Sequence, residues 1–148
     1  VIAGIEAGKI RKYVSDFANT TTAGHPGCIV MPHLGASTPE SEDNCASMAA
    51  KELIDYIENG NIVNSVNLPE VTMPRSGDNR VCVIHKNIPN MITKITGLVS
   101  EDGINIENLL NKSKGDYAYT MLDIGAADVA VLEKEINDIE GVIRVRII

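Results

Sequence analysis

The sequence predicts an α/β protein in two unlike parts: the C-terminal piece of a doubly wound parallel sheet with a connecting helix, followed by a ferredoxin-like βαββαβ domain. Three observations predict this organisation. Residues 28–31 are a short apolar run of the kind buried in a parallel sheet, and a strong helix start follows at Thr38. Residues 80–147 then alternate between strand and helix periodicity in the order βαββαβ. Because the apolar pattern lapses over residues 69–78, we place the boundary after Gly77.

The composition is that of a folded protein and argues against nucleic-acid binding. The 148 residues are 44% hydrophobic, which is enough for one core or two small ones. The 20 acidic residues outnumber the 13 basic ones and give a net charge of -7, so a phosphate backbone is not attracted. Aromatic side chains that could stack on bases are also scarce, being only Phe17 and four tyrosines.

Cysteine usage and hydropathy predict a cytoplasmic protein. Cys28, Cys45 and Cys82 are far apart and form no C-x-x-C motif, so neither a disulfide framework nor a zinc site is indicated. No apolar run approaches the ~20 residues that cross a bilayer, and residues 1–8 do not resemble a secretory signal. Since the chain begins with Val inside an apolar pattern, we expect it to be a fragment of a longer protein.

Short elements are expected before the long helix. Residues 1–8 have the pattern of a helix that Gly8 ends, and residues 10–16 have that of a short strand. A polar loop over residues 19–27 then leads into the apolar strand over residues 28–31. Two parallel strands are therefore predicted, with the second ending just before Pro32 and His33.

The long helix has clear start and stop signals. Thr38 can cap it with Pro39 at the first helical position, and Asn59 with Gly60 can end it. Glu40, Glu42 and Asp43 put negative charge in the first turn, where the helix dipole favours it. Apolar residues at helical spacing form one stripe that we expect to face a core. They are Cys45, Met48, Ala49, Leu53, Tyr56 and Ile57.

The second part is more regular. Its predicted elements are a strand over 80–86, a helix from 91 to the stop at Gly103, strands over 104–110 and 117–124, a helix over 129–139, and a strand over 143–147. The polar turn over 111–116 joins the two middle strands as a hairpin. This order predicts a four-stranded antiparallel sheet with both helices on one face, and with the other face free for a partner.

His33 is the candidate acid/base. Histidine takes or gives a proton near neutral pH, and this one follows a predicted strand, where a doubly wound sheet places its ligand crevice. Gly35 and Ala36 would let a ligand approach the backbone. The alternative is a histidine that only forms hydrogen bonds within a packed loop.

The carboxylate that would orient His33 is not fixed by the sequence. Asp16 closes the other predicted strand and would lie at the same crevice edge, or it is a solvated strand-end carboxylate. Glu40, Glu42 and Asp43 better serve the helix dipole. Residues 17–24 contain no acidic residue.

A second polar cluster follows the first strand of the second part. His85 and Asn87 precede Pro89, which favours a helix start whose free amides face the loop, and Asn105 opens the next strand. Imidazole and carboxamide groups could hold a small zwitterion without burying a net charge. A well-capped turn without a ligand is the alternative.

Motifs for other chemistries are absent from the sequence. It has no G-x-G-x-x-G, no G-x-x-x-x-G-K-[ST], no G-x-S-x-G and no H-E-x-x-H. The three histidines are too scattered to suggest a metal site.

The segment from Pro32 to Thr38 closely resembles the catalytic-histidine segment of the D-2-hydroxyacid dehydrogenases. The resemblance extends over nearly the whole chain. Residues 8–17 are similar to the last helix and strand of that family's cofactor domain, and residues 59–67 to its return to the other domain. The resemblance is to members that oxidise 3-phosphoglycerate and carry an ACT regulatory domain. It implies that residues 1–77 belong to the nucleotide-binding domain with its connecting helix and linker, and residues 78–148 to the ACT domain.

The resemblance also implies roles for individual residues. NAD would accept a hydride while His33 takes the hydroxyl proton, giving 3-phosphohydroxypyruvate in L-serine biosynthesis. Asp16 would lie near the nicotinamide, and the backbone of His33, Leu34, Gly35 and Ala36 would line the cofactor.

The resemblance implies an effector site in the second part. L-serine, as feedback inhibitor, would bind to His85 and Asn87 of one subunit and to Asn105 of its neighbour in a homo-oligomer paired through ACT domains. Asn90 stands where the family usually has a glycine after the proline, and its side chain could crowd the ligand.

Two alternatives stay open. If the chain is complete, it would be a stand-alone amino-acid sensor or dimerisation module without catalysis. If it is a fragment, the parent could oxidise another 2-hydroxy acid, because the substrate-binding arginine and the cofactor glycine loop of the family have no counterpart in this sequence.

Overall fold

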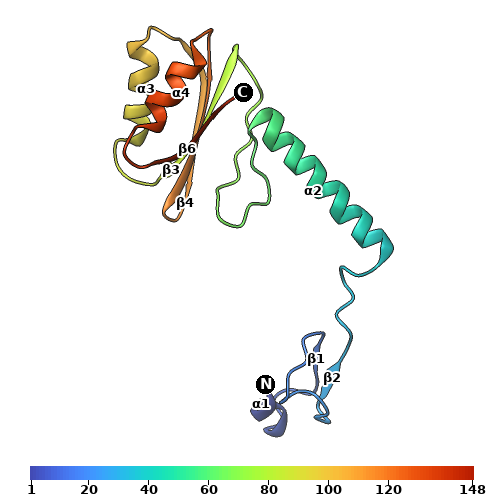
Figure 1. The fold of residues 1–148 in the computed structure, drawn as a ribbon. Helices are drawn as coiled ribbons and strands as arrows, with labels where there is room; N and C mark the ends of the chain where they lie inside the picture. The colour runs from blue at the N-terminus through green and yellow to red at the C-terminus, as the bar shows by residue number, and fades with distance from the viewer. The chain divides into compact units, whose positions relative to one another are not determined.

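The computed structural model describes all residues from Val1 to Ile148, and they form two compact units (Figure 1). The first unit is Val1–Met48 and the second is Ala49–Ile148. The division lies inside a helix, whereas the sequence predicted a boundary after Gly77. The difference arises because the segment after the helix, which looked like a linker, packs on the sheet of the second unit. No helix is long and apolar enough to cross a bilayer.

The first unit contains the predicted parallel strand pair. After α1 (Ile2–Glu6), β1 (Tyr13–Ser15) pairs in parallel with β2 (Cys28–Val30). Both strands are three residues long, shorter than predicted. Because the strands are parallel, their carboxyl ends lie at the same edge, which is the feature that positions the candidate acid/base.

Helix α2 (Pro39–Asn59) begins and ends as predicted. The hydroxyl of Thr38 accepts a hydrogen bond from the Ser41 amide at 3.2 Å, and Gly60 ends the helix with a φ of 72°. The prediction that its apolar stripe faces a core is wrong. The helix has no buried residue, and Leu53 and Ile57 are 61% and 60% exposed. Of the stripe, only Tyr56 near the end of the helix packs against a core, that of the second face of the sheet, and it is only partly buried.

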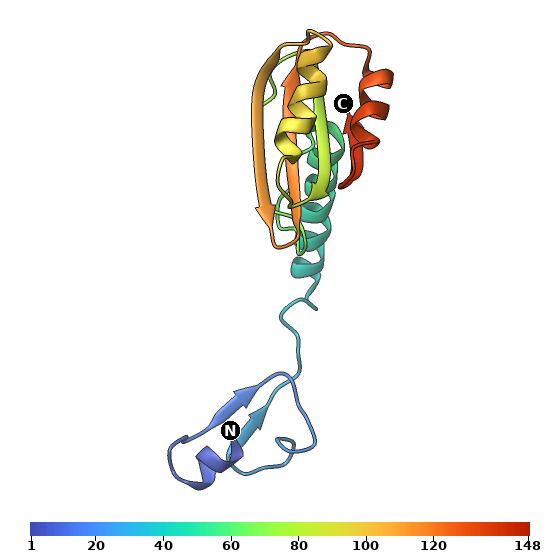
Figure 2. The same ribbon diagram turned by 90° about the vertical axis from the view of Figure 1, so that its left-hand side faces the viewer.

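The second unit confirms the ferredoxin-like βαββαβ order. Its elements are β3 (Asn79–Lys86), α3 (Met91–Glu101), β4 (Ile106–Lys114), β5 (Tyr117–Ile124), α4 (Val129–Asn137) and β6 (Val142–Ile147). The antiparallel sheet has the strand order β4-β5-β3-β6. Helices α3 and α4 lie on one face of it (Figure 2). The β4–β5 turn is tighter than predicted, so Asn111 lies within β4 and not in the turn.

The main core under the helices is a cluster of buried apolar side chains. Val83 of β3, Leu122 of β5, Ile95 of α3 and Ile136 of α4 are all completely buried there. Alternation along β3 and β5 sends every second side chain into this core, which is why the strand period was readable in the sequence. Burial of this apolar area is the main force that holds the helices on the sheet.

The opposite face of the sheet is covered by the chain itself, so the prediction that this face is free for a partner is wrong. Ile62 and Val71 form an antiparallel bridge, with N–H···O distances of 2.8 and 2.9 Å, in the segment that follows α2. Their side chains, with Met73, pack against Tyr119 and Met121 of β5. The Tyr119 hydroxyl donates to the Gly60 carbonyl at 2.7 Å. A polar-looking segment thus completes a second core.

The segment between α2 and β3, residues 60–78, is called the covering segment below. A buried ion pair joins it to the sheet. Arg80 of β3 and Asp123 of β5 are both 0% exposed, and the guanidinium donates to the two carboxylate oxygens at 2.6 and 2.7 Å. Arg80 also donates to the carbonyls of Asn59, Met73 and Pro74 at 2.8 to 2.9 Å. One side chain of β3 therefore binds β5, the end of α2 and the covering segment.

The environment of Asp123 fixes its charged state. Burial by itself raises the pKa of this carboxyl, but the hydrogen bonds from Arg80 and Ser76 outweigh burial and hold the pKa below its ordinary value. The hydrogen bond to Asp123 raises the pKa of Arg80 in turn. Since the folded-state pKa of Asp123 is lowered, its contribution to stability is present at neutral pH and is lost as the pH falls through the folded-state pKa.

Removing one partner of this pair should destabilise the second unit strongly. We expect Arg80→Met to lower the free energy of unfolding by about 3–5 kcal/mol, because Asp123 is left buried and unpaired. The matched control is Arg144→Met on β6, an exposed arginine, for which we expect a change within about 0.5 kcal/mol. Urea unfolding followed by circular dichroism measures both. Equal losses in the two variants, or an Arg80→Met loss that does not shrink in acid, would contradict this account.

Candidate functional site

A polar pocket lies where β3 ends and α3 begins. Its volume is about 230 Å³. The lining residues are His85, Asn87, Ile88, Asn90, Met91, Ile92, Thr93 and Asn111. The fold thus brings together two of the three predicted effector residues, His85 and Asn87, and adds Asn111 from β4.

His85 is buried at the inner wall of this pocket. It is 2% exposed, and both ring nitrogens have partners within the chain. Nδ1 lies 2.8 Å from the Lys86 carbonyl oxygen, and Nε2 lies 2.8 Å from the hydroxyl oxygen of Thr120. The imidazole is therefore held in a fixed orientation.

Asn87 is exposed at the mouth of the pocket and is held by the hairpin turn. Its backbone amide donates to the Asp116 carbonyl at 2.8 Å, and its side-chain nitrogen donates to the Gly115 carbonyl at 3.1 Å. These contacts leave the carboxamide oxygen of Asn87 as an acceptor for a ligand.

The N-terminus of α3 forms another wall. Asn90 precedes the helix with a φ of 68° and makes no side-chain hydrogen bond to cap it. The first-turn amides of Met91, Ile92 and Thr93 have no partner within the helix, and the helix dipole is positive there. This wall can attract a carboxylate. Asn90 adopts the left-handed conformation that suits a glycine, which explains why asparagine is tolerated in this place.

The third predicted effector residue lies elsewhere in the chain. Asn105 lies just before the start of β4, whereas Asn111 lies nearer the other end of that strand. The side-chain nitrogen of Asn105 donates to the Glu107 carboxylate at 2.7 Å. It does not line the pocket of its own chain. A pocket completed by a second copy therefore stays a prediction.

In the first unit, the ends of the parallel strands bring Asp16 and His33 together. Nε2 of His33 lies 3.9 Å from Oδ2 of Asp16, and the two side chains are 52% and 44% exposed. The Phe17 ring packs edge-on against the imidazole with centroids 4.5 Å apart. Of the acids that the sequence left open, Asp16 is the one that reaches His33.

The backbone after His33 is open. Leu34, Gly35 and Ala36 are exposed, and a Cβ added at Gly35 would meet no atom within 4 Å. Ser41 donates to the Gly35 carbonyl at 3.3 Å and ties this turn to the start of α2. A flat group could approach the main chain here.

Sequence reasoning missed two residues of the pocket region, Asn111 and Thr120. Asn111 was assigned to the polar turn, and Thr120 looked like an ordinary strand residue. The alternation of side chains along β5 could have indicated Thr120. It shares a face with Leu122 and Ile124, which face the helices, and it is 0% exposed. A polar residue on a core-facing position indicates a specific hydrogen bond.

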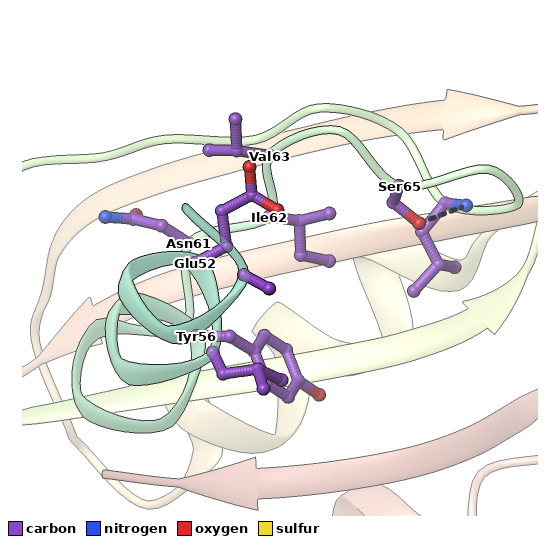
Figure 3. Close-up of a pocket in the computed structure, with 9 residues that line it drawn as sticks. Glu52, Tyr56, Asn61, Ile62, Val63 and Ser65 are labelled. Atoms are coloured by element: carbon purple, nitrogen blue, oxygen red, sulfur yellow. Dashed lines mark hydrogen bonds between the residues drawn. The ribbon is translucent and has the colours of Figure 1, made fainter. Parts of the chain in front are cut away.

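A further cavity of about 420 Å³ lies between α2 and the segment that follows it (Figure 3). Leu53 and Tyr56 of α2 face Ile62 and Ser65 across it. Glu52, which lines the cavity, accepts a hydrogen bond from the side chain of Asn64 at 2.6 Å. None of the predicted site residues lies in it.

Comparison with known proteins identifies the second unit. Residues 81–144 match the model of the AHAS small subunit-like ACT domain. The second unit contains an ACT domain. Its pocket at the β3–α3 junction is thus a feature of this ACT domain. The ACT domain of GTP pyrophosphokinase from Chlorobium tepidum is 19% identical, with a TM-score of 0.43, covering 47% of this chain and 95% of that one.

The similarity to curated proteins extends beyond the ACT domain. The chain is 35% identical over 123 residues to D-3-phosphoglycerate dehydrogenase of Escherichia coli strain K12, covering 81% of this chain. It is 32% identical over 131 residues to D-3-phosphoglycerate dehydrogenase 1 of Saccharomyces cerevisiae, covering 83% of this chain. The match spans 30% and 28% of the relatives' lengths. The predicted resemblance, to the C-terminal region of a 3-phosphoglycerate dehydrogenase with an ACT domain, is confirmed.

Proposed function

We propose that this chain is the C-terminal portion of a cytoplasmic, NAD-dependent D-3-phosphoglycerate dehydrogenase, and that its ACT domain binds L-serine as a feedback inhibitor. The polar pocket beside α3 is the observation that carries the regulatory half of this proposal. The names of the curated relatives support the enzymatic half.

The chemistry of the ACT pocket suits a small amino acid. The free amides of α3 can hold the carboxylate, and the carboxamide oxygen of Asn87 can accept from the ammonium group. About 230 Å³ leaves room for a short side chain. We propose that Asn105 of a second copy completes the pocket with His85 and Asn87, so that effector binding and pairing of ACT domains are coupled.

The first unit has features expected of part of a cofactor domain. Parallel sheets are normally covered on both faces, yet Val14 of β1 and Ile29 of β2 are 52% and 48% exposed. We propose that residues 1–77 comprise the C-terminal part of a nucleotide-binding domain, whose other elements cover these side chains in the intact enzyme, together with the connecting helix and the segment that packs on the second unit. The regulatory domain in this division is residues 78–148.

The residues present fit the nicotinamide end of a dinucleotide. Asp16, His33 and the open backbone of Leu34, Gly35 and Ala36 share one sheet edge. NAD, when bound there, supplies the hydride acceptor. His33 removes the proton of the C2 hydroxyl of 3-phosphoglycerate, and Asp16 favours the protonated imidazole that results.

L-serine should bind to the 148-residue chain in the millimolar range or tighter. We expect isothermal titration calorimetry to show binding that weakens about tenfold in Asn87→Ala, because one hydrogen bond to the effector is lost. Asn137→Ala, at an exposed asparagine of α4, is the matched control and should bind as the unmodified chain does. Absence of heat at several millimolar L-serine would contradict the feedback assignment.

In the intact parent enzyme, His33→Asn should lower kcat by about 10²- to 10⁴-fold while NAD affinity stays nearly unchanged, because only proton transfer is removed. The same substitution at His25 serves as control. His25 accepts the Gly27 amide proton at 3.0 Å in a loop, and its ring has no role in the proposed reaction. A loss below tenfold for His33→Asn, in steady-state kinetics with saturating substrates, would remove His33 from the mechanism.

A further inference from the structure

On the helix-covered face of the ACT sheet, three polar side chains contact one another in a row. The last of them lines the pocket. His85 of β3 and Thr120 of β5 are 2% and 0% exposed. Thr120 contacts His85 at 2.8 Å and Asn111 of β4 at 2.7 Å. Three neighbouring strands thus contribute one polar residue each. Asn111 is half-buried and lines the pocket with His85.

Both ring nitrogens of His85 are already engaged inside the chain. The Lys86 carbonyl can only accept, so Nδ1 carries a hydrogen and donates to it. Nε2 faces the Thr120 hydroxyl. A ligand could contact a ring nitrogen of His85 only by displacing one of these two partners, which would leave a buried polar group unpaired.

The hydroxyl of Thr120 links His85 to Asn111. It has one hydrogen, which it can give to Nε2 of His85 or to Oδ1 of Asn111, but not to both. If the hydrogen goes to Oδ1 of Asn111, Nε2 of His85 must carry a hydrogen of its own and donate to the hydroxyl oxygen, and the amide nitrogen of Asn111 is left for the pocket. If it goes to His85, Thr120 accepts from that amide nitrogen, and the carboxamide oxygen is left for the pocket. A free amino acid offers a partner to either group.

We propose that Asn111 is an effector-binding residue, and that His85 is a positioning residue that sets the orientation of the Asn111 carboxamide through the Thr120 hydroxyl. This inference rests on the proposed binding of an amino acid in the ACT pocket, and it adds a positioning role for His85, one of the residues that line the pocket. In this proposal Asn111 contacts the effector from β4, and the free amides contact it from the start of α3.

Two substitutions at Thr120 separate the hydroxyl from the shape of the side chain. Thr120→Val keeps the shape and removes the hydroxyl, whereas Thr120→Ser keeps the hydroxyl. We expect Thr120→Val and Asn111→Ala each to weaken L-serine binding about tenfold in calorimetry on the 148-residue chain, and Thr120→Ser to restore it to within about threefold. Thr96→Val in α3, where the hydroxyl donates to the Ile92 carbonyl at 2.9 Å, is the matched control and should not change affinity.

A second readout needs no ligand. We expect the side-chain amide resonances of Asn111 and the ring nitrogen resonances of His85 to shift together in Thr120→Val and to stay in place in Thr120→Ser and Thr96→Val. Unmoved Asn111 resonances in Thr120→Val would overturn the coupling even if L-serine binds.

The two proposals fail in different ways. If Asn87→Ala weakens binding but Asn111→Ala does not, the effector site stands and the role of Asn111 is overturned. If the unmodified chain binds no L-serine, feedback and the effector role of Asn111 fall together, while coupled resonance shifts would still report the His85–Thr120–Asn111 contact.

Discussion

The second unit depends on the buried contact between Arg80 and Asp123. The guanidinium donates to one carboxylate on the neighbouring strand and to three carbonyls from the end of α2 and the segment after it. An apolar side chain in place of Arg80 could fill the volume, but it could not satisfy those acceptors. The contact therefore determines which segment covers the second face of the sheet, and a ferredoxin-like domain gains two cores instead of one.

Strand β3 carries a polar anchor on each face. Arg80, at its start, faces the covering segment, and His85, at its end, faces the helices. Between them Val81 and Val83 are fully buried in the main core. The apolar middle of the strand fixes its register, and the register places His85 beside Thr120 at the inner wall of the α3 pocket. Stability and site geometry thus depend on the same eight-residue strand.

Much of this fold could be predicted from the sequence, because its elements carry local signals. Alternation showed the strands of the ACT domain, and Thr38 with Pro39 marked the start of α2. The covering segment could not be predicted, since its Pro, Ser and Gly residues resemble a linker, and its burial depends on distant partners such as Asp123. The exposure of most of the apolar stripe of α2 could not be predicted either. Helical spacing shows which residues share a face, but it does not show whether anything packs against that face. Of the candidate site, His33 with Asp16 and His85 with Asn87 followed from strand ends, whereas Thr120 and Asn111 required the register of three strands.

The central claim is that the segment after α2 folds as one unit with the sheet. Native-state hydrogen exchange of the Ile62 and Val71 amides, which bond to each other's carbonyls at 2.8 and 2.9 Å, tests this claim most directly. The account predicts opening free energies for these two amides within about 1 kcal/mol of those for the central strands β3 and β5. Exchange of both amides at the rate of exposed loop amides, while the sheet stays protected, would contradict it.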